Sequence, residues 1–407
     1  MGYELRPIVA EELPAFAAAD AAAFGWDMAP EDLDRIKNLL ELDRTLATFD
    51  GPEIVSSTAI YSFEMTVPGG ASLPAAGVTW VSVKPTHRRR GILREMMRRQ
   101  LSDVRERGES FAALWASESI IYGRFGYGLA AEGVEMRIDR AHAALRETPP
   151  RRGRTRLVTR EEALKHWPAV YDRVRASRPG MYARPEHWWQ YKVMPDPEHH
   201  PDGFTGSFFV QYEENGEVLG YARYRRKGED VDGLPAGVLR IQEVVPVTDV
   251  ARAELWDYLF GVDLVGRIEA WPWPADEPLF HMLADSRRLV RRIQDALWVR
   301  IVDPVTALSS RRYSTEGSVV IGVEDDFCPW VAGTYEVKGG PEGAQCKPSS
   351  KAPEIRLGAA ELGAVYLGGT SLETLARAGR VDGTEAAIRR ADAMFQWRPL
   401  PWGNEIF

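Results

Sequence analysis

Cysteine and histidine are scarce in this sequence of 407 residues. It contains two cysteines, Cys328 and Cys346, and seven histidines. Two thiols cannot build a disulfide framework, and their spacing matches no zinc-binding pattern. The histidines form no cluster along the chain. We therefore expect a protein of the reducing cytoplasm that needs neither disulfide bonds nor a metal ion.

Long apolar segments are also missing. No stretch approaches the ~18 uncharged apolar residues that indicate a transmembrane helix. The N-terminal sequence "MGYELRPIVAEELPAF" is acidic where a signal peptide has a basic start. The formal net charge of -8 argues against nucleic acid as the main partner and suits a cationic substrate. These features predict a soluble protein with no membrane or nucleic-acid partner.

The length and the 44% hydrophobic content predict two or three hydrophobic cores. Residues 4–145 show alternating helix and strand patterns, with a hairpin signal at Asp50-Gly51. A segment rich in proline, arginine and glycine follows at residues 146–157 and predicts a linker. Its basic run could contact nucleic acid, although such runs are usually solvated.

After this linker the pattern partly repeats. A second hairpin signal lies at Asn215-Gly216, and residues 238–260 again read as a strand, a Val-Pro step and a helix. From about residue 297, short strands and glycine-broken helical runs indicate a small α+β module. We therefore predict an α/β (α+β) protein with domains at residues 1–147, 148–296 and 297–407.

One segment concentrates positive charge within this acidic protein. In "VSVKPTHRRRGILREMM", residues 81–97, a strand pattern leads into three arginines, a glycine and a helix start. Such a helix start directs unpaired backbone N–H groups to one point, which attracts phosphate. Arg89 and Arg90 would neutralise a pyrophosphate, and Gly91 would let it approach the main chain. The alternative is a solvated basic helix start.

Two common nucleotide motifs are absent from this turn. No Gly-Lys-Ser/Thr follows it, and no Gly-x-Gly-x-x-Gly precedes the helix. Nucleoside triphosphates and NAD are therefore disfavoured. The repeated pattern in the second domain lacks the Arg-Arg-Arg-Gly turn, so we expect a phosphate-bearing cofactor in the first domain only.

The turn resembles the acetyl-CoA loop of GNAT-type N-acetyltransferases, whose core is Arg/Gln-x-x-Gly-x-Gly/Ala. Leu93 stands where the last small residue is expected. Together with "ASESIIYGRFGYG", residues 116–128, the segment is similar to the Eis (enhanced intracellular survival) family, in which this departure is usual. The resemblance implies tandem GNAT-like domains, a sterol-carrier-like domain whose C-terminus reaches the active site, and a homohexamer.

The same resemblance implies direct transfer of acetyl from acetyl-CoA to an amine. A splayed strand would hold the pantetheine arm and the acetyl carbonyl, and the arginine turn would hold the pyrophosphate. Ser117 and Glu118 would lie along the cofactor. The expected cofactor-binding residues are Val81, Ser82, Val83, Arg89, Arg90, Gly91, Ile92, Leu93, Arg94, Ser117 and Glu118.

The family pattern Tyr-x-x-x-Gly-Phe aligns Tyr122 with the catalytic general acid and Tyr127 with an aromatic core position. A phenol suits the acid role because it keeps its proton at neutral pH. For the general base, the resemblance implies the terminal carboxylate of Phe407. The apolar tail "QWRPLPWGNEIF" could carry this group into a pocket, and burial or an intervening water would have to raise its basicity. Simple hydrophobic docking of Phe407 is the alternative.

A pocket lined by aromatic faces and carboxylates could receive a cationic amine. The candidates are Phe24, Trp26, Asp27, Trp80 and Glu405. The resemblance implies a broad pocket that accepts aminoglycosides at one or more positions and also lysine-type amines. Two other functions remain open at this point: a protein-lysine or peptide acetyltransferase, and a non-enzymatic lipid-carrier scaffold.

Overall fold

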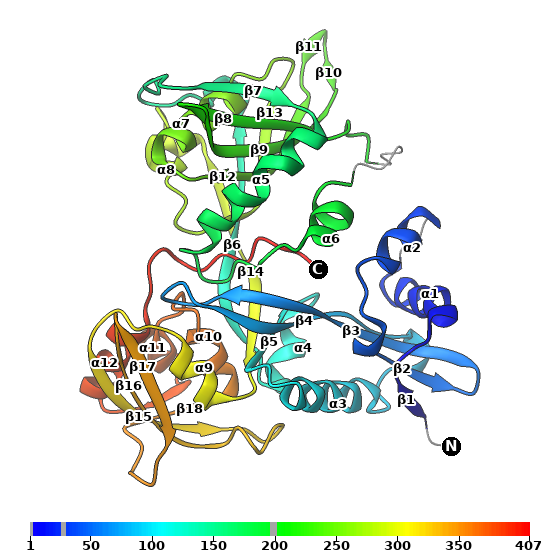
Figure 1. The fold of residues 1–407 in the computed structure, drawn as a ribbon, viewed down its shortest axis with the longest axis vertical. Helices are drawn as coiled ribbons and strands as arrows, with labels where there is room; N and C mark the ends of the chain where they lie inside the picture. The colour runs from blue at the N-terminus through cyan, green and yellow to red at the C-terminus, as the bar shows by residue number, and fades with distance from the viewer. Residues whose placement is uncertain (1–2, 26–29, 196–201) are drawn as a thin grey trace. The chain divides into compact units, whose positions relative to one another are not determined.

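A computed structural model describes residues 3–25, 30–195 and 202–407. The chain forms two compact units (Figure 1). The first unit contains residues 1–131, 178–183 and 295–407, and the second contains residues 132–177 and 184–294. In the described residues, no helix is both long and apolar enough to span a membrane.

The first unit is built on a sheet in the order β1-β2-β3-β4-β5-β14. The hairpin predicted at Asp50-Gly51 is confirmed, because β2 and β3 pair in antiparallel fashion up to Asp50 and Glu53. Residues 297–301 of β14 pair with β5. The strands are β1 (Glu4–Arg6), β2 (Thr45–Asp50), β3 (Glu53–Thr66), β4 (Ser72–Val83), β5 (Phe111–Trp115) and β14 (Val290–Ile301).

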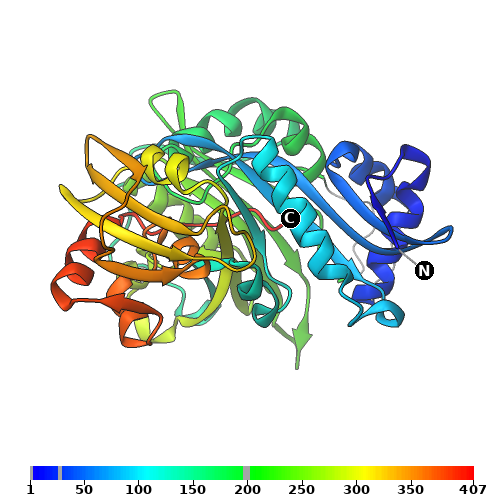
Figure 2. The ribbon, with the colours of Figure 1, turned by 90° about the horizontal axis from the view of Figure 1, so that it is seen from below.

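Helices cover this sheet. Helix α1 (Leu13–Phe24) packs on β3 and β4, and α3 (Ile92–Glu106) contacts β2 to β5; Figure 2 shows α3 running along these strands. The apolar residues of α3 recur at helical spacing and are buried, which explains how this highly charged helix is anchored. Two shorter helices are α2 (Pro30–Lys37) and α4 (Ser119–Tyr122).

The last part of the first unit is an α+β module, as the sequence predicted. Its strands run in the order β17-β16-β15-β18-β19. They are β15 (Gly317–Glu324), β16 (Gly333–Gly340), β17 (Gly343–Pro348), β18 (Ile355–Gly358) and β19 (Val381–Gly383). The helices are α9 (Pro304–Ser310), α10 (Ala359–Val365), α11 (Leu372–Arg377) and α12 (Glu385–Phe395).

A buried arginine organises this module. The Arg311 guanidinium donates hydrogen bonds to the carbonyls of Val365 and Tyr366 at the end of α10 and, at 2.7 Å, to that of Phe395 at the end of α12. Helix ends leave such carbonyls without intrahelical partners, so one side chain satisfies two helix termini. Burial lowers the pKa of Arg311, which is the physical cost of this arrangement.

The second unit has a sheet in the order β6-β13-β12-β9-β8-β7. The hairpin predicted at Asn215-Gly216 is confirmed by the pairing of β8 with β9. The larger elements are β6 (Gly128–Asp139), β7 (Arg154–Val158), α5 (Arg160–Arg175), β8 (Phe208–Glu214), β9 (Glu217–Lys227), β12 (Val238–Pro246), α7 (Asp249–Phe260) and β13 (Arg267–Pro274). The short ones are α6 (Glu186–Trp188), β10 (Asp230–Val231), β11 (Leu234–Pro235) and α8 (Leu279–Met282).

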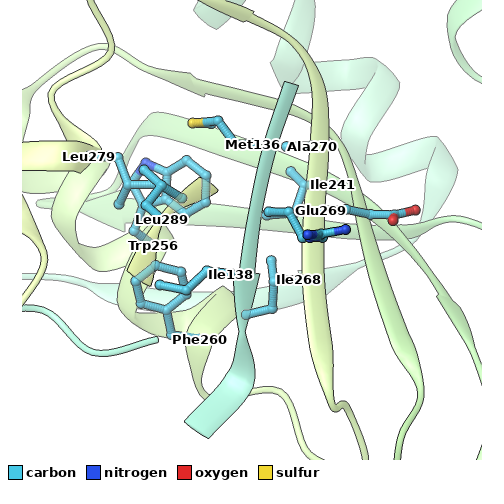
Figure 3. Close-up of a pocket in the computed structure, with 11 residues that line it drawn as sticks. Met136, Ile138, Ile241, Trp256, Phe260, Ile268, Glu269, Ala270, Leu279 and Leu289 are labelled. Carbon is cyan, nitrogen blue, oxygen red and sulfur yellow. The ribbon is translucent and has the colours of Figure 1, made fainter. Parts of the chain in front are cut away.

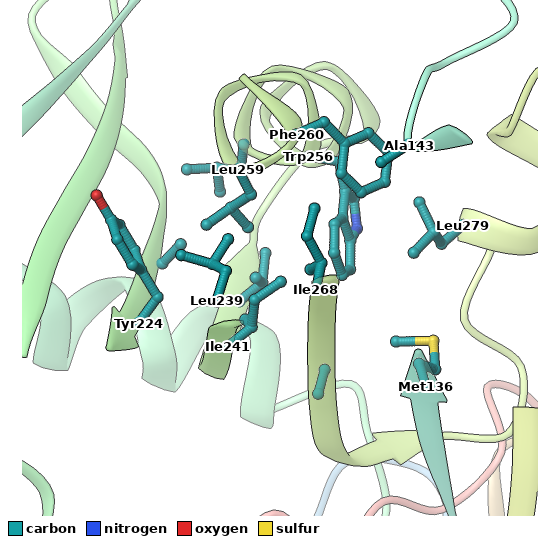
Figure 4. Packing of buried hydrophobic residues seen from close by; sticks show 14 of the residues in the cluster. Met136, Ala143, Tyr224, Leu239, Ile241, Trp256, Leu259, Phe260, Ile268 and Leu279 are labelled. Carbon is teal, nitrogen blue, oxygen red and sulfur yellow. The ribbon is translucent and has the colours of Figure 1, made fainter. Parts of the chain in front are cut away.

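The core of the second unit lies between its sheet and α7. Leu239 and Ile241 of β12 pack with Trp256, Leu259 and Phe260 of α7 (Figure 4). A cavity lined by Ile241, Trp256 and Phe260 together with residues of β6 and β13, drawn in Figure 3, has a volume of about 10 Å³. A cavity of this size holds at most about one water molecule, so this part of the core is filled with protein and offers no space for a cofactor.

Candidate active site

The two central strands of the first unit separate from each other. Strand β4 pairs in parallel with β5 only at residues 75–77, opposite residues 111–113. Further along β4, the register with β3 becomes irregular, and Trp80 adopts a left-handed conformation with φ 55°. Residues 81–83 therefore continue β4 beyond its contact with β5, which leaves their backbone groups on that side available to a ligand.

A cleft of about 590 Å³ lies beside residues 81–83. Every residue predicted to bind the cofactor lines this cleft, with the exception of Arg90. Tyr122 lines it as well, and so does Phe24, from the predicted amine-binding set. The structure thus brings together residues from β4, the arginine turn, α3 and the segment after β5.

The start of α3 gives the cleft an anion-binding end. In the described part of the chain, no side chain caps this helix, whose N-cap residue is Gly91 with φ 85°. A Cβ at Gly91 would meet no atom within 4 Å, so the main chain is open to a ligand here. Arg89 and Arg94 line the cleft beside it. Open backbone donors flanked by guanidinium groups fit the diphosphate of coenzyme A.

Arg90 does not line the cleft and has a different role. Its guanidinium donates hydrogen bonds to the Tyr3 hydroxyl at 2.8 Å and to the Thr86 carbonyl at 3.0 Å. His87, in the same turn, lies between Asp50, at 3.2 Å, and the Thr86 hydroxyl, at 2.8 Å. These contacts hold the turn in place, so Arg90 fixes the loop while Arg89 and Arg94 line the cleft.

Tyr122 ends helix α4 and is almost fully buried, with 4% of its surface exposed. Burial raises the pKa of its phenol to about 12, and a hydrogen bond with the Ser117 side chain acts in the opposite direction. The group therefore carries its proton throughout the physiological pH range and can act as an acid. Tyr127 packs edge-on against it, with ring centroids 6.0 Å apart, and is completely buried.

The chain end lies on the same sheet. The Phe407 ring packs edge-on against Phe63 of β3, with centroids 5.1 Å apart, and against Tyr61 at 6.4 Å. A side chain at Gly77 would overlap Phe63 and come within 3.3 Å of Phe407. Gly77 is the last residue of β4 that pairs with β5. The terminal residue thus sits at the point where the cleft strands separate.

The predicted amine-binding residues are only partly brought together. The Trp80 indole donates a hydrogen bond to the Tyr61 hydroxyl at 3.3 Å, which places it beside the aromatic group that holds Phe407. Phe24 is half exposed at the cleft, whereas Glu405 is buried in the tail. Trp26 and Asp27 lie outside the described residues.

Three aromatic residues around Phe407 did not stand out in the sequence. Tyr61 and Phe63 alternate on one face of β3, a spacing that could have indicated a shared aromatic surface. Tyr182, whose ring lies 5.6 Å from that of Phe407, belongs to no motif and follows β3 by more than a hundred residues. No group of three or more potential metal ligands gathers within the described residues.

Comparisons with known proteins divide the sequence into three regions. Residues 4–130 and residues 180–301 each match a family model described as an acetyltransferase (GNAT) domain. Residues 304–404 match one described as a sterol carrier protein domain. The chain therefore contains two GNAT domains followed by a sterol-carrier domain.

Relatives match along nearly the whole chain. An uncharacterized N-acetyltransferase of Streptomyces avermitilis is 41% identical over 92% of this chain and 92% of its own length. The N-acetyltransferase Eis of Mycobacterium tuberculosis is 35% identical over 95% of this chain and 94% of its own. The crystal structure of Eis1 from Mycobacterium abscessus superposes with a TM-score of 0.86 and 33% identity, covering 99% of this chain and all of that one.

Proposed function

Because this chain belongs to the Eis family of GNAT-type N-acetyltransferases, we propose that it acetylates primary amines of polycationic substrates, with aminoglycosides as the substrate class. The GNAT fold implies acetyl-CoA as the cosubstrate. Tyr122 serves as the general acid, and the terminal carboxylate of Phe407 serves as the general base. The family resemblance further supports a homohexamer in the cytoplasm, and light scattering of the purified protein tests that assembly.

In this mechanism the chain's own residues bind, orient and move protons. Arg89, Arg94 and the start of α3 hold the phosphates, and the backbone of residues 81–83 aligns the thioester. The amine nitrogen forms a bond to the acetyl carbon while the carbon–sulfur bond breaks. Phe407 takes the proton that leaves the nitrogen, and Tyr122 gives its proton to the departing thiolate. Exchange with solvent restores both groups.

One observation carries this proposal. A buried phenol and the chain end come from different parts of the chain and both lie along β4. Tyr122 lines the cleft together with residues 81–83, and the Phe407 ring packs close to Gly77, where the pairing of β4 with β5 ends. An acyl transfer that needs an acid for the thiolate and a base for the amine requires two such groups around one carbonyl.

Release of free thiol from acetyl-CoA tests activity and substrate class together. We expect rapid release with aminoglycosides that carry several primary amines, and mass spectrometry should find one or more added acetyl groups. Thiol release with a lysine peptide but not with any aminoglycoside would indicate a protein-lysine acetyltransferase instead. The absence of release with every amine, in a protein that binds acetyl-CoA, would overturn the proposal.

A further inference from the structure

Residues 178–183 lie at the start of the second GNAT region, whose family match begins at residue 180, and belong to the first compact unit. We call this segment the clasp. Its backbone extends the sheet at β3: Gly180 donates to the Thr66 carbonyl at 2.9 Å, Thr66 donates to the Met181 carbonyl at 2.9 Å, and Ala183 donates to the Glu64 carbonyl at 2.8 Å. Strand β2 pairs with β3 only as far as Ala59, so the clasp takes the edge that β2 leaves.

The clasp also binds the C-terminal tail. The Trp402 amide donates to the Pro179 carbonyl at 2.8 Å. The Arg178 guanidinium donates to the Leu400 carbonyl, also at 2.8 Å. A side chain at Gly180 would come within 3.0 Å of the Trp402 carbonyl, which shows how closely the two backbones approach. The tail is therefore held by its main chain shortly before it ends.

The same segment contacts the terminal residue itself. The Tyr182 ring is fully buried between Phe63, with centroids 4.6 Å apart, and Phe407, with centroids 5.6 Å apart and planes at 85°. The tail is thus fixed at two points, the backbone of residues 400–402 and the ring of Phe407. The clasp contributes to both.

A chain end needs such fixation if it is to do chemistry. Terminal residues normally fray, because ordering a residue costs conformational entropy. A general base must lie within hydrogen-bond reach of the proton that it accepts. Two anchors on either side of residues 403–406 limit the positions that the carboxylate can reach.

We propose that Arg178 and Tyr182 are positioning residues that hold the terminal carboxylate at the reaction centre. This proposal rests on the proposed role of Phe407 as general base. In this proposal the second GNAT region contributes to catalysis without binding a second cofactor. It supplies the clasp, which positions the Phe407 carboxylate in the active site of the first GNAT domain.

The test uses the full-length protein with Arg178→Ala and Tyr182→Leu, and Arg175→Ala as the matched control. Arg175 lies in the preceding helix, where it pairs with Asp172 at 3.0 Å. We expect carboxypeptidase to release Phe407 at least roughly tenfold faster from both clasp variants, because their tails detach more often. We expect kcat to fall roughly 10- to 100-fold while the Kd for acetyl-CoA stays unchanged, since the clasp acts on the base and not on the cleft. The control should match the parent protein in all three measurements.

A double-mutant cycle separates positioning from a general structural effect. In a parent that carries Gly-Ser after Phe407, the carboxylate is already displaced, so Arg178→Ala should lower kcat no further. The proposal would be overturned if Arg178→Ala lowered kcat in the extended protein by the same factor as in the parent. It would also be overturned if a clasp variant had a reduced kcat but released Phe407 to carboxypeptidase no faster than the parent. Arg178→Lys keeps a donor for the Leu400 carbonyl and should recover most of the activity, which excludes misfolding as the cause.

Failure of the proposed function gives a different result. If the Gly-Ser extension leaves kcat unchanged, the terminal carboxylate is not the base, and the clasp has nothing catalytic to position. Faster tail release from the clasp variants would then still report the physical anchoring. If Arg178→Ala changes neither tail release nor kcat, the clasp proposal fails although the base assignment can stand.

Discussion

At the residue scale, Tyr122 and Tyr127 lie five residues apart but have different surroundings. Tyr122 lines the cleft and shares a hydrogen bond with Ser117. The Tyr127 hydroxyl is buried and, within the described residues, has no hydrogen-bond partner. The two rings pack edge-on, yet only Tyr122 lines the cleft.

This difference gives a paired prediction. Tyr122→Phe should lower kcat at least roughly 100-fold, because general acids contribute about 10²–10⁴-fold, and should leave the Kd for acetyl-CoA unchanged. Tyr127→Phe removes a hydroxyl without a recorded partner and should retain near-normal kcat. Steady-state thiol release and acetyl-CoA titration measure both. Normal turnover by the Tyr122 variant would remove this residue from the mechanism.

Gly126 lies between these two tyrosines and packs closely against the buried guanidinium of Arg300. With φ at 82°, a Cβ here would lie 2.7 Å from the guanidinium carbon of Arg300. Arg300 is completely buried and forms an ion pair with Asp325, a residue of the sterol-carrier module. Asp325 also accepts a hydrogen bond from the Cys328 amide at 2.8 Å. A side chain at position 126 would therefore have to displace a fixed ion pair.

Gly126→Ala should lower the free energy of unfolding by about 2–3 kcal/mol, through backbone strain and the clash with Arg300. It should also lower kcat, because Tyr122 belongs to the displaced segment. Gly123→Ala is the control: no atom lies within 4 Å of the added Cβ, and its φ of -56° is helical. We expect that variant to differ by less than about 0.5 kcal/mol in urea denaturation. Equal stabilities would refute the packing argument.

At the scale of elements, the starts of two helices differ in a way that favours phosphate binding in the first GNAT region only. The N-cap residue of helix α3 is Gly91, and no side chain of the described residues caps this helix. The N-cap residue of helix α7, at the matching place in the second unit, is Thr248, whose hydroxyl accepts a hydrogen bond from the Ala251 amide at 3.1 Å. The Ala251 amide, one of the backbone donors that a phosphate would need, is therefore already occupied.

Arg94 and Arg98 offer a matched test of the anion-binding end. They lie one turn apart on α3, and both guanidinium groups lie over the Phe327 ring, at 5.6 and 5.5 Å. Only Arg94 lines the cleft. Arg94→Gln should raise the Kd for acetyl-CoA roughly 10- to 100-fold, the loss of a hydrogen bond to a charged group of about 1.5–3 kcal/mol. Arg98→Gln should not. Equal effects, measured by calorimetry, would show that the helix contributes only general charge.

Local pattern was sufficient to predict the elements that carry the cleft. Strand, turn and helix at residues 81–97 follow from β-branched residues, glycine and helical spacing, and the structure contains all three. The orientation of Arg90 could not be predicted, because it depends on Tyr3, a residue distant in sequence. The clasp could not be predicted either, since nothing in residues 178–183 indicates that they pair with β3.

At the scale of the whole molecule, each region of the sequence contributes to the proposed active site. The first GNAT region supplies the cleft and Tyr122, the second supplies the clasp, and the sterol-carrier region leads into the tail that ends at Phe407. In the sequence, a repeated pattern predicted the second region, a change to short strands and glycine-broken helices predicted the third, and the family resemblance implied its sterol-carrier fold. Their convergence required the structure, because contacts between a chain end and two distant segments leave no periodic signal.

Extension of the chain end tests whether the Phe407 carboxylate is the general base. Appending Gly-Ser after Phe407 leaves every side chain in place and moves only the terminal carboxylate. We predict that thiol release from acetyl-CoA with an amine substrate falls roughly 100-fold, in the range expected for loss of a general base, while the Kd for acetyl-CoA is unchanged. Undiminished thiol release by the extended protein would contradict the assignment of Phe407 as the base.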